Sequence, residues 1–305
     1  MRIVYLGTPE FSVAPLNKLI ECGYDVVAVV TNKDKPVGRK KVITPPPVKV
    51  FATEHDIPVY QYDRIRLEGV EDIKNLNPDL LITCAFGQIL SQEILDVPKL
   101  GVLNIHASLL PKYRGASPIH YAILNGEKQT GITIMKTDIG IDTGDTLLQQ
   151  TVEIGDDETC GELFSKLSFV GAECIVKAIE LVESGEAEFI KQDNDLATLT
   201  KIIKKEDALI DWADSAINIF NKIRAFNPSP IAFCYLNGQP FKIYKARLGD
   251  KKGEAGQILS ADKTLEIACG EGSLILEVVQ KSGGSAMNIS DFLRGNKFVV
   301  GEKFV

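Results

Sequence analysis

The chain has 305 residues and a formal net charge of −7, with 45% hydrophobic and 25% charged residues. This composition is typical of a soluble globular protein, and no apolar run approaches the roughly 18 residues that a membrane span requires. The chain enters a strand pattern at once, without the apolar segment of a signal peptide, so we expect a cytoplasmic protein that does not bind membranes. Its length predicts two domains.

The cysteines predict no chemistry of their own. All six lie far apart in the sequence, without a C-x-x-C pair, and mostly among apolar residues. We expect reduced thiols that pack as small hydrophobic side chains. A structural zinc site would need closely spaced Cys or His ligands, and we expect no metal.

The first part of the chain alternates strand-like and helix-like segments. Residues 2–6, 25–31, 79–86 and 101–107 are near-continuous apolar runs, of the kind that parallel sheets bury on both faces. Residues 13–20 follow the first run with a helical period. The pattern predicts an α/β fold: a doubly wound, mostly parallel, Rossmann-like domain that binds ligands at the carboxyl ends of its strands.

The later elements indicate a change of architecture. Strand-like residues 131–138 and 146–154 precede a long amphipathic helix over 158–184, and a polar segment of mixed charge then follows. Beyond it, residues 231–236 and 240–246 flank Asn237-Gly238, a strong hairpin signal, and further short strands predict a small β-barrel. We expect a catalytic domain over 1–189, a linker over 190–205 and an OB-like domain over 206–305.

The first strand does not end in a dinucleotide-binding turn. Gly7 is the one glycine of the segment GTPEF, whereas a Rossmann turn needs G-x-G-x-x-G to make room for pyrophosphate. Thr8, Pro9 and Glu10 suit the start of a helix, which needs no ligand. A nicotinamide enzyme is therefore disfavoured.

Two polar side chains interrupt the apolar run at 101–107. Asn104 and His106 are two residues apart, so on a strand both point to the same face. An amide donor beside an imidazole suits acyl transfer, in which an oxygen gains negative charge and a proton moves. The alternative is a buried histidine that only satisfies its neighbours.

The loops beside this strand add further candidates. Residues 108–115, SLLPKYRG, can offer backbone groups to a flat heterocycle while their apolar side chains form the wall of a pocket. Asp138, Asp142 and Asp145 lie in a glycine-rich turn whose spacing does not match an EF-hand calcium loop. One of these carboxylates could orient an imidazole, or the turn could simply be capped by aspartates.

A basic segment follows the strand at 25–31. Residues 31–49 contain six basic residues and one acid, which is most often a solvated loop. Because the segment leaves the carboxyl end of a strand, its Lys and Arg side chains could instead bind the phosphates of a large substrate.

Together these segments resemble the methionyl-tRNA formyltransferase family along essentially the whole chain. The resemblance is carried by GTPEF, KPVGRKKVITPPPVK, NIHASLLPKYRGASPI, TGITIMKTDIGIDTGD and IRAFNPSPIA. It implies an enzyme that moves a formyl group from 10-formyltetrahydrofolate to methionyl initiator tRNA for translation initiation. We expect the protein to be a monomer. The second domain would help to hold the tRNA.

The resemblance also implies roles for individual residues. Asn104, His106 and Asp142 match the catalytic trio. The folate-contacting segment is matched by Ser108, Leu109, Leu110 and Pro111. Arg39, Lys40 and Lys41 match the loop that enters the tRNA acceptor stem, although Lys40 stands where many members have glycine.

Two other functions stay open at this point. The protein could be a folate-dependent formyltransferase or hydrolase that acts on a small molecule, such as a sugar nucleotide or glycinamide ribonucleotide. Such an enzyme would have no evident function for the basic loop. A non-catalytic RNA-binding protein would not need the complete Asn-His-Asp set.

Overall fold

The computed structural model describes residues 1–38 and 40–304. The contacts within the chain define two compact units. The first comprises residues 1–115, 129–153 and 164–200, and the second comprises residues 116–128, 154–163 and 201–305.

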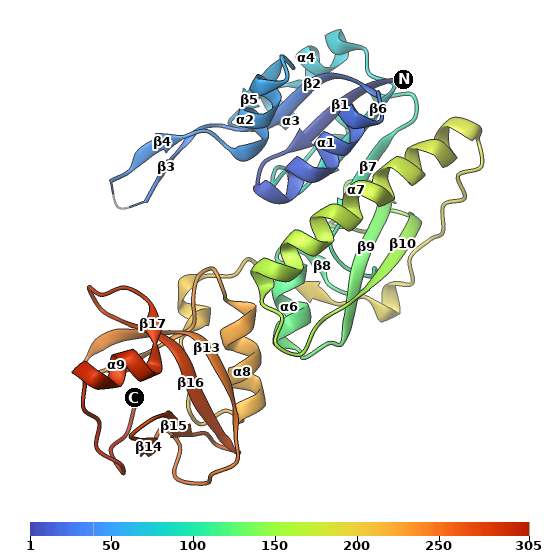
Figure 1. Cartoon of the computed structure of the whole chain (residues 1–305). Helices are drawn as coiled ribbons and strands as arrows, with labels where there is room; N and C mark the ends of the chain where they lie inside the picture. Colours follow the sequence, from blue (N-terminus) through green and yellow to red (C-terminus); the bar gives the residue numbers. More distant parts are fainter. Residues whose placement is uncertain (39, 305) are drawn as a thin grey trace. The chain divides into compact units, whose positions relative to one another are not determined.

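A seven-stranded sheet in the order β10-β9-β7-β6-β1-β2-β5 forms the centre of the first unit (Figure 1). Its strands are β1 (Arg2–Gly7), β2 (Asp25–Asn32), β5 (Val59–Tyr62), β6 (Leu80–Cys84), β7 (Val102–His106), β9 (Gln129–Lys136) and β10 (Thr146–Glu153). The five strands from β7 to β5 are parallel, whereas β9 runs antiparallel to β7 and β10 antiparallel to β9. The predicted α/β class with a mostly parallel sheet is confirmed.

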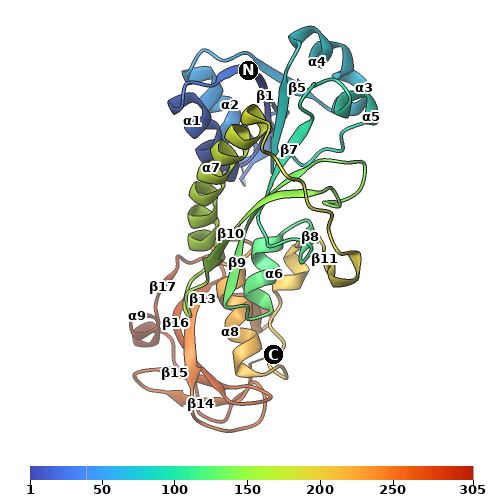
Figure 2. The ribbon, with the colours of Figure 1, turned by 90° about the vertical axis from the view of Figure 1, so that its right-hand side faces the viewer.

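Helices cover both faces of this sheet, which explains why its central strands are apolar throughout (Figure 2). One face carries α1 (Val13–Glu21), α2 (Pro47–Glu54) and the part of α7 (Cys160–Ser184) that belongs to the first unit; the other carries α3 (Ile65–Glu68), α4 (Val70–Leu76) and α5 (Gln92–Leu95). The hydroxyl of Ser168 on α7 donates to the Phe11 carbonyl at 2.8 Å, and the Phe11 and Phe164 rings meet edge to face at 5.0 Å.

The order of the strands determines where a ligand site can form. From β1 the chain first builds outward through β2 to β5, and then builds in the opposite direction through β6 and β7. At such a reversal the connections leave the carboxyl ends of neighbouring strands in opposite directions and open a crevice. The candidate residues of β7 lie one strand away from it.

A two-stranded hairpin replaces the loop expected in the basic segment. It consists of β3 (Lys35–Val37) and β4 (Val42–Thr44), whose side chains are all exposed, and it projects beyond the sheet (Figure 1). Its base is fixed to the unit because the Lys49 ammonium lies 2.8 and 2.9 Å from the Asp34 carboxylate oxygens.

The second unit is organised around an antiparallel sheet in the order β12-β13-β16-β15-β14, with β17 paired to β16. The strands are β12 (Phe233–Leu236), β13 (Gln239–Gly249), β14 (Ile258–Ala261), β15 (Leu265–Ala268), β16 (Ser273–Lys281) and β17 (Met287–Asn288); the helices are α6 (Pro118–Leu124), α8 (Ala216–Ala225) and α9 (Ile289–Gly295). The hairpin predicted at Asn237-Gly238 is confirmed, and both residues have positive φ, as a type I′ turn requires. Phe241 and Phe292 pack edge to face at 5.5 Å in the core.

Candidate active site

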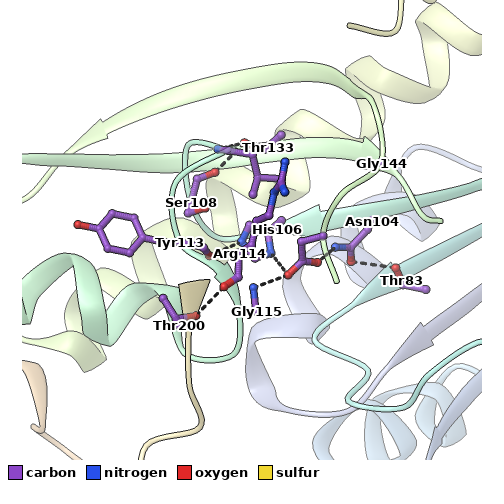
Figure 3. A network of polar contacts seen from close by, with 12 residues as sticks. Thr83, Asn104, His106, Ser108, Tyr113, Arg114, Gly115, Thr133, Gly144 and Thr200 are labelled. Carbon is purple, nitrogen blue, oxygen red and sulfur yellow. Dashed lines mark hydrogen bonds and ion pairs between the residues drawn. The ribbon is translucent and has the colours of Figure 1, made fainter. Parts of the chain in front are cut away.

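The end of β7 brings Asn104 and His106 to one face of the sheet, as their spacing predicts (Figure 3). Asn104 is partly buried and pairs in register with Thr83 of β6, while His106 is only 6% exposed and pairs with Thr133 of β9. Both side chains therefore stand on the rigid centre of the sheet.

A neighbouring hydroxyl fixes the orientation of the Asn104 amide. The Thr83 hydroxyl donates to the Asn104 Oδ1 atom at 2.8 Å, so the amide nitrogen points the other way. That nitrogen lies 3.5 Å from the Asp142 Oδ1 atom, which is a long contact for a hydrogen bond. The NH₂ group of Asn104 is therefore held loosely enough to donate to a substrate oxygen.

Asp142 reaches the site from the turn between β9 and β10. Asp138 shapes this turn, since its carboxylate accepts from the Gly140 amide at 3.0 Å and from the Thr143 hydroxyl at 2.7 Å. Asp142 has a φ of 51°, and its Oδ2 atom accepts the backbone N–H of Gly115 at 2.7 Å. Of the aspartates in the turn, Asp142 is thus the one whose carboxylate contacts both Asn104 and His106.

The two ring nitrogens of His106 face two acceptors. Nε2 lies 3.0 Å from the Tyr113 carbonyl oxygen, which can only accept, so Nε2 carries a proton. Nδ1 lies 3.5 Å from the Asp142 Oδ2 atom. Nδ1 is therefore the ring nitrogen that faces the carboxylate, and a proton on it points to Asp142.

The segment expected to contact folate has a firmly held backbone. Ser108 is fully buried, and its hydroxyl donates to the Lys112 carbonyl at 2.7 Å. The Leu110 N–H donates to the Thr133 hydroxyl at 3.1 Å, and its carbonyl accepts from the Gln149 amide at 2.7 Å. The Leu110 side chain is buried, whereas those of Leu109 and Pro111 are only half-buried.

The tRNA candidates lie elsewhere in the first unit, on the basic hairpin. Lys40 and Lys41 are exposed in the turn between β3 and β4. Arg39 lies outside the described residues. The hairpin projects away from the sheet on which Asn104 and His106 stand (Figure 1).

Other residues that contact the candidate trio are not predicted by the sequence pattern. Thr83 orients Asn104, and the Gly115 amide binds Asp142. Gln192, in the segment expected to be a linker, donates to the carbonyl oxygens of Asp142 and Gly144 at 2.9 and 2.7 Å. No local pattern marks Gln192, because its partners are 48 to 78 residues away in the sequence.

The cysteines are free thiols, as predicted, and all but Cys22 are buried. Burial raises the pKa of the Cys84 and Cys234 thiols to about 12, which leaves them protonated and unreactive at neutral pH. Within the described residues, no group of three or more His, Cys, Asp or Glu side chains is arranged to hold a metal ion. Nor do residues 1–38 and 40–304 include a helix long and apolar enough to cross a membrane.

Family models match both parts of the chain. Residues 1–179 match the model described as "Formyl transferase", and residues 202–297 match "Formyl transferase, C-terminal domain". Together with the α/β sheet and the Asn-His-Asp site, these matches define a formyl-transferring enzyme with a second domain.

Full-length relatives narrow the class further. The chain is 43% identical to a methionyl-tRNA formyltransferase of Geobacter sulfurreducens, over 99% of this chain and 96% of the relative. It is 47% identical to one of Bacillus thuringiensis subsp. konkukian, over 99% of this chain and 98% of the relative. The chain belongs to the methionyl-tRNA formyltransferase family.

Solved structures share the fold at lower identity. WlaRD, a sugar 3N-formyl transferase crystallised with dTDP and 5-N-formyl-THF, has a TM-score of 0.68 at 23% identity, over 93% of this chain and 99% of that one. HypX from Aquifex aeolicus in complex with tetrahydrofolic acid has a TM-score of 0.64 at 19% identity, over 96% of this chain and 47% of that one. These similarities show that the fold also occurs in both of these proteins.

Proposed function

We propose that Asn104, His106 and Asp142 are the groups with which this enzyme transfers the formyl group of 10-formyltetrahydrofolate to the α-amine of methionyl initiator tRNA. The observation that carries the proposal is their convergence at the end of β7, where the Asp142 carboxylate lies 3.5 Å both from the Asn104 amide nitrogen and from the His106 Nδ1 atom. These are the contacts of an amide donor and an imidazole that share one carboxylate.

In the first step the free α-amine attacks the formyl carbon carried by N10 of the folate. The carbonyl electron pair moves to oxygen and gives a tetrahedral oxyanion. The Asn104 NH₂ group and the Nδ1–H of His106 donate to that oxygen, because their contacts to the Asp142 carboxylate are long, at 3.5 Å, and leave both donors available to the substrate. The Nε2–H group stays hydrogen-bonded to the Tyr113 carbonyl oxygen, and this bond fixes the plane of the ring.

In the second step the oxyanion collapses and the carbon–N10 bond breaks. The attacking nitrogen loses one proton and N10 gains one, so the products are the N-formylated aminoacyl-tRNA and tetrahydrofolate. His106 gives its Nδ1 proton to N10 and takes the proton of the attacking nitrogen in exchange, and the negative charge of Asp142 stabilises the imidazolium form.

The folate would lie against the segment of residues 108–111. Ser108 and Leu110 are buried, and their hydrogen bonds hold the segment in one conformation. The half-buried Leu109 and Pro111 are then the members whose side chains can contact the pterin ring. In this arrangement Ser108 and Leu110 shape the wall of the folate pocket, and Leu109 and Pro111 contact the folate.

The tRNA would be bound by the basic hairpin and by the second domain. Lys40 and Lys41 are exposed and stand beside Arg39 in the sequence, so this tip can meet the phosphates of the acceptor stem. The antiparallel sheet within residues 206–305 supports an OB-like domain, which is a common platform for nucleic acids. We propose residues 1–189 as the catalytic domain and 190–205 as the segment that leads from it to residues 206–305, although residues up to 200 still belong to the first compact unit.

A single assay tests the substrate. The purified enzyme is given 10-formyltetrahydrofolate with charged initiator tRNA, charged elongator tRNA or glycinamide ribonucleotide, and formyl transfer to each is measured. We expect transfer to the initiator tRNA alone. Faster transfer to glycinamide ribonucleotide would instead establish a small-molecule formyltransferase, for which the basic hairpin has no use.

A further inference from the structure

The segment between the two family matches passes through the candidate active site. Residues 180–201 lie outside both matched ranges, and residues 190–205 read as a linker in the sequence. In the structure β11 (Leu199–Thr200) pairs in parallel with β8 (Arg114–Gly115), and the Thr200 hydroxyl donates to the Arg114 carbonyl at 3.1 Å (Figure 3). This part of the segment is therefore built into the first unit.

Gln192 connects this segment to the turn that carries Asp142. Its side-chain nitrogen donates to the Asp142 carbonyl at 2.9 Å and to the Gly144 carbonyl at 2.7 Å. Its side-chain oxygen accepts from the Arg114 guanidinium at 3.0 and 2.8 Å. Gln192 is 7% exposed and Arg114 is 5% exposed, so water does not replace these bonds.

The guanidinium decides which way the Gln192 amide faces. Arginine has only donors, so the amide oxygen must point to Arg114 and the NH₂ group must point to the turn. Arg114 is itself held by the Asn194 side-chain oxygen at 2.9 Å. Two backbone carbonyls of the turn are thereby fixed relative to β8, the strand whose Gly115 amide binds the Asp142 carboxylate.

From these contacts we infer that Gln192 is a positioning residue for the formyl-transfer reaction: oriented by Arg114, it holds the backbone of the turn so that the Asp142 carboxylate faces His106. The inference rests on the proposed role of Asp142. It explains why a glutamine serves here, since a glutamate would bind Arg114 equally well but would oppose two carbonyl oxygens with a third oxygen.

The test variant is Gln192→Glu, measured alone and in an Asp142→Asn background. The carboxylate keeps the charge-assisted contact to Arg114, so the melting temperature should stay within a few degrees of wild type. Both N–H donors to the turn are lost, and a shift of about 1 Å in catalytic geometry costs on the order of 10²-fold in turnover. We expect kcat to fall by that factor, with the KM values of folate and tRNA changed less than about threefold.

The double variant separates positioning from a general structural effect. If Gln192 acts through Asp142, adding Gln192→Glu to Asp142→Asn should lower kcat by less than about twofold, because coupled sites are not additive. Single-turnover assays at high enzyme concentration keep these slow variants measurable. Gln192→Met, which keeps the volume and removes the donors, repeats the cycle if the glutamate variant does not fold.

The control is Gln150→Glu, the same chemical change on an exposed residue of β10 whose side chain donates to the adjacent Thr151 carbonyl. It should keep normal turnover. The inference is overturned if Gln192→Glu keeps normal kcat, or if its cost is equally large in both backgrounds. Normal turnover in Asp142→Asn alone would overturn the proposed catalytic role of Asp142 as well, which distinguishes the two failures.

Discussion

The candidate active site and the basic hairpin belong to the same unit but are built in opposite ways. At the site, His106 is 6% exposed, and one polar atom of each member of the trio is directed by a neighbour on the sheet or in its loops. On the hairpin, every residue of β3 and β4 is exposed, and Val37, Val42 and Ile43 are more than half exposed. The hairpin is fixed to the unit at its base, where Lys49 binds Asp34.

The difference separates two tasks. Stabilising an oxyanion requires donors that do not reorganise during the reaction, which a buried, hydrogen-bonded site provides. Binding the phosphates of a large substrate requires exposed charge that can reach outward, and it tolerates looser geometry. Changes at the site should therefore lower turnover, whereas changes on the hairpin should weaken tRNA binding.

The largest effect is expected at the site. Asn104→Ala and His106→Ala should each lower kcat by about 10²- to 10³-fold, since each removes one donor to the oxyanion, worth roughly 2.7 to 4 kcal/mol. The double variant should lose less than the sum, because both act on one oxygen. Steady-state kinetics measures this, and a single variant with near-normal kcat would exclude that residue from the site.

A smaller effect is expected on the hairpin. Lys40→Ala, Lys41→Ala and Arg39→Ala should raise the KM for charged tRNA, by about tenfold for a lysine that contacts a phosphate, and leave the KM for folate unchanged. Such a variant should also reduce the slope of log affinity against log salt by about 1. Lys99→Ala, elsewhere on the surface, is the control. Equal changes in both KM values would contradict the division of tasks.

Gly115 tests how far the site depends on its backbone. Its φ is 99°, and a Cβ atom there would lie 2.8 Å from the Thr200 carbonyl oxygen. Gly115→Ala should therefore lower the free energy of unfolding by more than about 1 kcal/mol, and reduce kcat several-fold by moving the N–H that binds Asp142. The control is Gly23→Ala. Gly23 also has a positive φ, but apart from its chain neighbours no described atom lies within 4 Å of the new Cβ, so turnover should stay normal. Denaturant unfolding and kcat are measured on both.

The smallest effect concerns the base of the hairpin. The hydrogen bond from Lys49 and, to a smaller extent, the one from Gln61 lower the pKa of Asp34 below its ordinary value. A lowered carboxyl pKa adds stability above the unfolded-state pKa of about 3.9, and this contribution is lost as the pH falls through the folded-state value. Wild type should therefore lose stability below about pH 4 more steeply than Asp34→Asn. Parallel curves in acid-induced unfolding would show that the pair does not stabilise the fold.

Local patterns predicted much of the architecture. The apolar runs located β1, β2, β6 and β7, and the Asn237-Gly238 pair located the hairpin of the second unit, because these features depend on neighbouring residues. The antiparallel direction of β9 and the hairpin in the basic segment were not predicted, since strand direction depends on distant pairing.

The site could be predicted only in part for the same reason. Asn104 and His106 share a strand face, and that follows from a spacing of two. The roles of Thr83 and Gln192 depend on contacts with residues 21 to 78 positions away in the sequence. The Tyr113 and Gly115 contacts use backbone atoms that nearly every residue has. The pattern of side chains along the sequence therefore does not predict these contacts.

The backbone bond from Gly115 to Asp142 also has an evolutionary consequence. Every amino acid other than proline has a main-chain N–H, so an exchange at this position can displace the donor but cannot delete it in the way that it deletes a side chain. An inherited exchange at residue 115 can therefore affect the Asp142 carboxylate only by changing the path of the backbone. Lineages that drift elsewhere would then keep this contact as long as they keep the turn and the strand beside it.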